Sequence, residues 1–150
     1  RCAGRGNKVV FAQFLKDGTS GECRVLAKLP DVTVMAANPV GKFSFRMTDA
    51  EKQAAAEWYT AQFRKIAETV QHGAYAMLVL DELLSCITCG FLPEQLVLDF
   101  LENRPEALEV VITGRDPSAA LLERADYVTE MTLRKHPYEK GISARKGIEY

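Results

Sequence analysis

The sequence lacks the features that mark several common classes of protein. No apolar run approaches the about 18 residues of a membrane span, and the first residues do not show the charged-then-apolar pattern of a signal peptide. We therefore expect a cytoplasmic protein without a membrane partner. The net charge of -1 argues against nucleic-acid binding through phosphate neutralisation, although residues 134–146 form a local basic stretch.

Cysteine is also too scarce for a disulfide framework. Four cysteines occur in 150 residues, and two of them, Cys86 and Cys89, are separated by two residues. A structural zinc site needs four ligands, and no second pair or nearby histidine accompanies these two. We therefore favour reduced cysteines on a buried helix over a metal or redox pair.

A phosphate-binding loop of the form Gly-x-x-x-x-Gly-Lys-Ser/Thr is absent from the sequence, yet its usual companion is present. Residues 76–83 form an apolar run that ends in two adjacent carboxylates, Asp81 and Glu82. Such a run is typical of a buried parallel strand, and acidic residues at its carboxyl end lie where α/β folds bind ligands. This is the pattern of a Walker B segment.

Apolar runs alternate with helical patterns along the chain. Strands are predicted at residues 8–14, 31–35, 76–81, 108–113 and 127–131, with a Gly-rich turn at 16–21. A long amphipathic helix is predicted from the capping box of Thr48 and Glu51 to the stop at His72 and Gly73. Shorter helices are predicted through Cys86, from Pro93 to before Pro105, and from Asp116, whereas the residues before Gly6 resemble the end of a helix.

This alternation predicts an α/β fold with a mainly parallel sheet and helices on both faces. A composition of 47% hydrophobic residues over 150 residues suffices for one core, and no linker interrupts the chain. We therefore expect a single domain, residues 1–150.

The carboxyl ends of parallel strands share one crevice, so the polar residues there are the candidates for chemistry. They are Gln13, Lys16, Asp81, Glu82, residues 113–115, and Glu130. Carboxylates beside an amide, a lysine and an arginine suit a magnesium-bound polyphosphate, because hard oxygens hold the ion and cations meet the remaining charge. The alternative is that each residue is merely a solvated strand end.

The motifs resemble those of the P-loop type of ATP:corrinoid adenosyltransferase. The resemblance covers nearly the whole chain in order, and its most specific parts are the Thr-Gly-Arg strand end and the C-terminal tail. The matching segments are residues 1–6, 9–16, 78–83, 104–105, 110–115, 125–126, 128–131 and 135–150.

This resemblance implies a fold and a reaction. It implies a RecA-like P-loop NTPase fold and a transferase that moves the 5′-deoxyadenosyl group of ATP to Co(I) of a reduced corrinoid, in adenosylcobalamin synthesis or salvage. Triphosphate is released. It further implies magnesium or manganese, a cytoplasmic homodimer, and an electron donor such as a reduced flavoprotein.

The resemblance also implies roles for individual residues. Asp81 and Glu82 match the acidic pair that holds or orients the metal, and they are the expected catalytic residues. The residues that match ATP-binding positions are Arg1, Gln13, Lys16 and Arg115. Those expected at the corrinoid are Phe43, Phe45 and His136, although Phe43 and Phe45 would also fit an ordinary buried strand edge.

The absence of a phosphate loop from these residues leaves three interpretations open. The simplest interpretation is that the fold's first strand and phosphate loop precede Arg1 and are missing from these residues. A RecA-type ATP-dependent binding or motor module would use the same acidic strand to hydrolyse ATP. A third possibility is a non-catalytic corrinoid-binding fragment, which would have no phosphate loop at all.

Overall fold

The computed structural model describes residues 1–38 and 46–148 of the chain. These residues form two compact units, Arg1–Pro117 and Ser118–Tyr150. Of the helices in the described ranges, none has the length and apolar character that a membrane span requires.

The first unit is an α/β structure built on a four-stranded sheet. Its strands are β1 (Val9–Gln13), β2 (Val32–Val34), β3 (Met77–Asp81) and β4 (Glu109–Ile112), in the spatial order β2-β1-β3-β4. Every pairing is parallel. The predicted parallel sheet is thus confirmed for its first four strands, each shortened by one or two residues at its ends.

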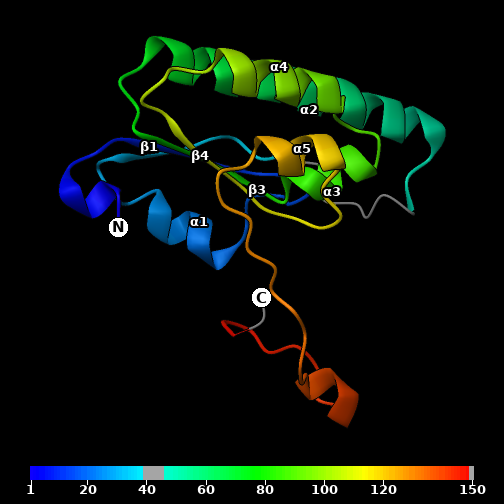
Figure 1. Cartoon of the computed structure of the whole chain (residues 1–150). Helices are drawn as coiled ribbons and strands as arrows, with labels where there is room; N and C mark the ends of the chain where they lie inside the picture. The colour runs from blue at the N-terminus through cyan, green and yellow to red at the C-terminus, as the bar shows by residue number, and fades with distance from the viewer. Residues whose placement is uncertain (39–45, 149–150) are drawn as a thin grey trace. The chain divides into compact units, whose positions relative to one another are not determined.

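Helices occupy the crossovers between the strands, as parallel pairing requires. They are α1 (Gly21–Leu26), α2 (Asp49–His72), α3 (Leu83–Thr88) and α4 (Glu94–Asn103), and the short 3₁₀ helix η1 (Ala3–Arg5) precedes β1. In Figure 1, α2 and α4 lie on one side of the strands and α1 lies on the other. The sheet therefore has helices on both faces, as predicted, although α1 itself was not predicted.

Helix α2 forms where its sequence signals predicted it. The Glu51 amide donates to Thr48 Oγ1 at 3.3 Å, and the Glu51 carboxylate accepts from the Thr48 amide at 2.8 Å, so the capping box is closed at both ends. The helix ends at His72, directly before Gly73. Its buried face consists of the residues that the helical spacing selected, which are Ala55, Tyr59, Phe63, Ile66 and Val70.

The core lies between this face of α2, the sheet and helix α4. The ring centroid of Tyr59 lies 5.9 Å from that of Phe14 and 6.1 Å from that of Phe91. The rings of Phe63 and Phe100 pack edge-on, with their centroids 5.7 Å apart. Such aromatic contacts at the end of β1 hold the strand's carboxyl end against the helix layer. These contacts therefore fix the position of Phe14, the residue that follows Gln13.

The second unit corrects two predictions. Helix α5 (Ala119–Arg124) begins later than Asp116, because the Ser118 hydroxyl caps it by accepting from the Leu121 amide at 3.2 Å. The strand predicted at residues 127–131 does not form. A strand is stable only when a neighbouring backbone pairs with it, and no described strand pairs with this segment. The 3₁₀ helix η3 (Pro137–Lys140) follows.

Candidate functional site

Strands β1, β3 and β4 bring their polar ends together at the carboxyl edge of the sheet. Gln13 is the register partner of Asp81, and Leu80 is the partner of Ile112, which places Thr113 beside Asp81. The crevice predicted from the sequence is therefore built on three adjacent strands, and Asp81 stands on the middle one.

Both carboxylate oxygens of Asp81 accept hydrogen bonds from the neighbouring strand ends. Gln13 Nε2 donates to Oδ2 at 3.0 Å, and the Thr113 hydroxyl donates to Oδ1 at 2.8 Å. Because each oxygen keeps a further lone pair, the carboxylate is fixed in orientation and can still accept from, or coordinate, a ligand.

The Gln13 amide is buried and its hydrogen-bonding capacity is filled by the protein. Nε2 also donates to Glu22 Oε1 at 2.8 Å, while Oε1 accepts from the Ser20 hydroxyl at 2.8 Å and lies 3.5 Å from the Cys23 thiol. An amide offers two protons and two lone pairs, so these four contacts use all of them. Gln13 thereby links the start of α1 to Asp81.

Glu82 adopts a left-handed backbone conformation, with φ 58° and ψ 23°. For a residue with a Cβ this conformation costs about 1–2 kcal/mol, and it persists only where the surroundings hold it. Here the Glu82 amide donates to Thr113 Oγ1 at 2.9 Å, and Glu82 Oε2 accepts from the Ser85 hydroxyl at 2.8 Å. The turn between β3 and α3 is thus fixed by hydrogen bonds at Glu82.

Three polar residues of this network, Ser20, Glu22 and Ser85, were not predicted from the sequence, and Thr113 was predicted only as a strand-end residue. The pKa of the Glu22 carboxyl is lowered, first by the backbone N–H of Glu22 itself and then by the Gln13 amide. Glu22 lies in the first turn of α1, where such an N–H is free to bond an acceptor. It adds a third carboxylate near Asp81.

The predicted cationic residues lie outside this hydrogen-bond network. Arg1, Lys16 and Arg115 are all exposed, and no hydrogen bond or ion pair described in residues 1–38 and 46–148 joins them to Asp81 or Glu82. Lys16 follows β1, and its charge helps to lower the pKa of Glu22. Arg115 follows β4 at the same edge of the sheet.

The predicted corrinoid-binding residues are less completely described. Phe43 and Phe45 lie outside the described residues. His136 belongs to the second unit, where it caps η3 because its Nδ1 accepts from the Tyr138 amide at 3.1 Å.

The potential metal-ligating side chains of the described residues are not clustered. No cluster of three or more His, Cys, Asp or Glu side chains in residues 1–38 and 46–148 is arranged to hold a metal ion. Cys86 is fully buried on α3, and this burial raises the pKa of its thiol, whereas Cys89 is exposed. A protein-only metal cage is therefore not formed by these residues.

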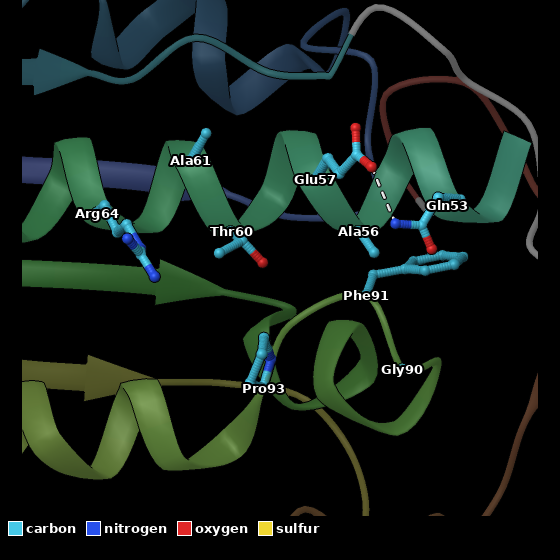
Figure 2. A pocket seen from close by; sticks show the side chains of 9 residues that line it. All are labelled: Gln53, Ala56, Glu57, Thr60, Ala61, Arg64, Gly90, Phe91 and Pro93. Atoms are coloured by element: carbon cyan, nitrogen blue, oxygen red, sulfur yellow. Dashed lines mark hydrogen bonds between the residues drawn. The ribbon is translucent and has the colours of Figure 1, made fainter.

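A hollow of about 400 Å³ lies away from the strand ends, between α2 and the segment that leads into α4 (Figure 2). One wall is formed by a single α2 face on which Gln53 donates to the Glu57 carboxylate at 2.9 Å. The hollow contains none of the strand-end polar residues. Its lining is Gln53, Ala56, Glu57, Thr60, Ala61, Arg64, Gly90, Phe91 and Pro93. We therefore assign the candidate site to the sheet edge.

The fold and this edge define a class of protein. A parallel sheet flanked by helices, with an oriented aspartate and a following glutamate at the carboxyl end of β3, is consistent with the P-loop NTPase-like class.

Comparison with known families gives the particular assignment. The family model for "ATP:corrinoid adenosyltransferase BtuR/CobO/CobP" matches residues 1–150, and the chain belongs to this family.

Curated relatives agree with the family match over the whole chain. A corrinoid adenosyltransferase of Pseudomonas aeruginosa is 35% identical over 154 residues, which cover 100% of this chain and 73% of the relative. One of Escherichia coli strain K12 is 34% identical over 156 residues, covering 100% and 74%. The corrinoid adenosyltransferase CobA of Salmonella typhimurium is 33% identical over 153 residues, with the same coverage of 100% and 74%.

Proposed function

We propose that this protein transfers the 5′-deoxyadenosyl group of ATP to Co(I) of a reduced corrinoid and releases triphosphate. The observation that carries this proposal is the family match over residues 1–150, and it makes the protein a transferase. The organised acidic pair at the end of β3 supplies the local chemistry that this reaction needs. ATP and a corrinoid are then its substrates.

The reaction needs alignment and charge stabilisation more than a protein nucleophile. Co(I) of the corrinoid attacks the ribose C5′ carbon of ATP, a cobalt–carbon bond forms, and the C5′–oxygen bond breaks with its electron pair leaving on the triphosphate. The protein must therefore hold the two substrates in line and stabilise the charge on the leaving group. Arg1, Lys16 and Arg115 are the proposed cationic contacts of the phosphates.

The acidic pair fits a magnesium or manganese ion bound together with a polyphosphate. Such ions are usually held by one or two protein carboxylates plus substrate phosphates, and a cage of three protein groups is not required. Asp81 and Glu82 would hold the ion, which would neutralise part of the triphosphate charge. The two fixed donors on Asp81 support this role, because they orient its remaining lone pairs.

Gln13 takes a more specific place in this proposal than the sequence indicated. It was expected to contact ATP, but its amide is filled by four protein contacts. We infer that it acts on the nucleotide through Asp81.

The remaining parts of the site are proposed from the family resemblance. Phe43 and Phe45 would form an apolar wall against the corrin ring, and His136 would lie near the corrinoid. A RecA-like arrangement would add a phosphate loop and a further strand to the sheet described here. A reduced flavoprotein as electron donor, a homodimeric state and a cytoplasmic location belong to the same proposal, as does a single domain over residues 1–150.

The proposal is tested with chemically reduced cobalamin and magnesium ATP. We expect the visible spectrum of the Co(I) form to be replaced by that of an alkylated corrinoid, and brief illumination should destroy this product. A light-stable spectrum with no ATP-dependent change would refute the proposed transfer. An active-site variant, Asp81→Asn, serves as the matched control, because it should bind corrinoid and transfer little.

A further inference from the structure

Thr113 makes three hydrogen bonds to residues 81–84, which span the end of β3, the turn after it and the start of α3. Its hydroxyl donates to Asp81 Oδ1 at 2.8 Å and accepts from the Glu82 amide at 2.9 Å, and its carbonyl oxygen accepts from the Leu84 amide at 3.3 Å. One residue at the end of β4 therefore contacts both members of the acidic pair and the first residues of α3.

The direction of the hydroxyl proton follows from these partners. A hydroxyl has one proton and two acceptor lone pairs, and the Glu82 amide can only donate. The proton of Thr113 is therefore directed to Asp81, and a lone pair receives the Glu82 amide. A hydroxyl does both tasks at once, and neither a methyl group nor hydrogen can replace it.

The backbone at the end of β4 permits this close contact. A Cβ atom added to Gly114 would lie 2.7 Å from Leu84 Cβ and 3.1 Å from the Leu84 amide nitrogen. The β4 end and the first turn of α3 thus approach more closely than two ordinary residues allow. This approach brings the Thr113 hydroxyl within reach of the Glu82 amide.

We propose that Thr113 is a positioning residue for the transfer reaction. It sets the orientation of the Asp81 carboxylate and holds Glu82 in its left-handed backbone conformation, so that both carboxylates face the nucleotide phosphates in one arrangement. This inference rests on the proposed function for its effect on turnover. Its structural part, control of Asp81 and Glu82 by one hydroxyl, stands independently.

The hydroxyl is tested by comparing Thr113→Val, Thr113→Ala and Thr113→Ser. Removing a residue that orients a ligating group typically costs about 10- to 100-fold in activity or metal affinity. We expect kcat to fall by about this factor in the valine and alanine variants, the KM for corrinoid to stay within about twofold, and the serine variant to recover most of kcat. Thr88→Val is the matched control, because Thr88 donates to the Leu84 carbonyl on α3 and contacts neither carboxylate.

A second measurement does not depend on turnover. Amide hydrogen exchange followed by NMR reports the protection of the Glu82 N–H in the protein without substrates. We expect exchange at Glu82 to be faster by about 10-fold or more in the alanine and valine variants and near the wild-type rate in the serine and Thr88→Val variants. The serine–alanine comparison isolates the hydroxyl even where the valine variant does not fold.

The outcomes separate this inference from the proposed function. A wild-type protein that forms no adenosylated corrinoid refutes the function, and the exchange experiment still decides the role of the hydroxyl. Wild-type kcat together with wild-type Glu82 exchange in Thr113→Ala would overturn the inference. A serine variant as impaired as the alanine variant would also overturn it, because the hydroxyl would then not be the group that matters.

Discussion

Replacement of Gly114 by alanine tests how tightly the end of β4 meets α3. Gly114 has φ 137°, a region that is almost restricted to glycine, and an added Cβ would lie 2.7 Å from Leu84 Cβ. The nearest atoms belong to the Leu84 backbone and its Cβ, so a side-chain rotation cannot relieve the contact. The β3–α3 turn must move instead.

The expected cost has two parts. The backbone conformation contributes about 1–3 kcal/mol, and overpacking of a close contact contributes about 1–3 kcal/mol. If the two parts add, Gly114→Ala should lower the free energy of unfolding by about 2–6 kcal/mol. Turnover should fall as well, since the displaced turn carries Glu82.

Two other glycines provide graded controls. Gly90 has φ 73° with no atom within 4 Å of an added Cβ, so Gly90→Ala should cost only about 1–2 kcal/mol. Gly4 has neither a positive φ nor a nearby atom, and Gly4→Ala should stay within about 0.5 kcal/mol of the wild type.

Urea unfolding of the three variants measures these differences. Gly114→Ala should be the least stable of the three variants, followed by Gly90→Ala and then Gly4→Ala. A Gly114→Ala variant within about 0.5 kcal/mol of Gly4→Ala would refute the close approach of β4 and α3.

Three further predictions address the acidic pair, the core and α2. Glu82→Gln should lower kcat by about 10-fold or more, which is the loss expected when a metal-positioning group is removed. The corrinoid affinity measured by titration should not change. Equal losses in kcat and in corrinoid affinity would argue against a metal role for Glu82. Burial raises the pKa of Tyr59 to about 12, so the folded state disfavours its ionisation. The stability that Tyr59 contributes is fully present below about pH 10 and is lost as the pH rises toward 12. In that window the unfolding free energy of the wild type should fall relative to that of Tyr59→Phe by up to about 1.4 kcal/mol per pH unit. Unfolding free energies of the two proteins that change in parallel with pH would contradict this prediction. Thr48→Ala should lower the unfolding free energy by about 1 kcal/mol through loss of the capping box, and an unchanged urea midpoint would show that the cap contributes nothing.

Local signals in the sequence were sufficient for the elements that carry them. Helix α2 combines a capping box, a helical repeat of apolar residues and a terminal glycine, and the structure places all three as predicted. Strands β1 and β3 are apolar runs with buried or half-buried side chains on both faces, whereas β4 alternates between exposed and half-buried residues. Periodicity and caps act over a few residues, so a single sequence reveals them.

Elements that depend on distant partners were harder to predict. Residues 127–131 have strand composition but form no strand, because pairing is a property of two segments. Helix α1 begins at Gly21 and has only six residues, so the Gly-rich turn before it concealed its start. Without α1, Glu22 could not be recognised as a neighbour of Gln13.

The candidate site shows the same division. Asp81 and Glu82 were predicted because a buried strand ending in acidic residues is a local pattern. The role of Thr113 depends on the register between β3 and β4 and on the left-handed turn at Glu82, and neither is encoded in a short motif. The sequence placed Thr113 at a strand end, and only the structure relates its hydroxyl to both carboxylates.

The leaving group of the reaction tests the central claim most directly. Phosphorus NMR of a reaction mixture with ATP, magnesium and chemically reduced cobalamin distinguishes triphosphate from ADP and phosphate. Adenosyl transfer predicts one triphosphate for each cobalt–carbon bond formed, and none when corrinoid is omitted. Release of ADP and phosphate, with or without corrinoid, would contradict the account and would identify an ATP-hydrolysing module instead.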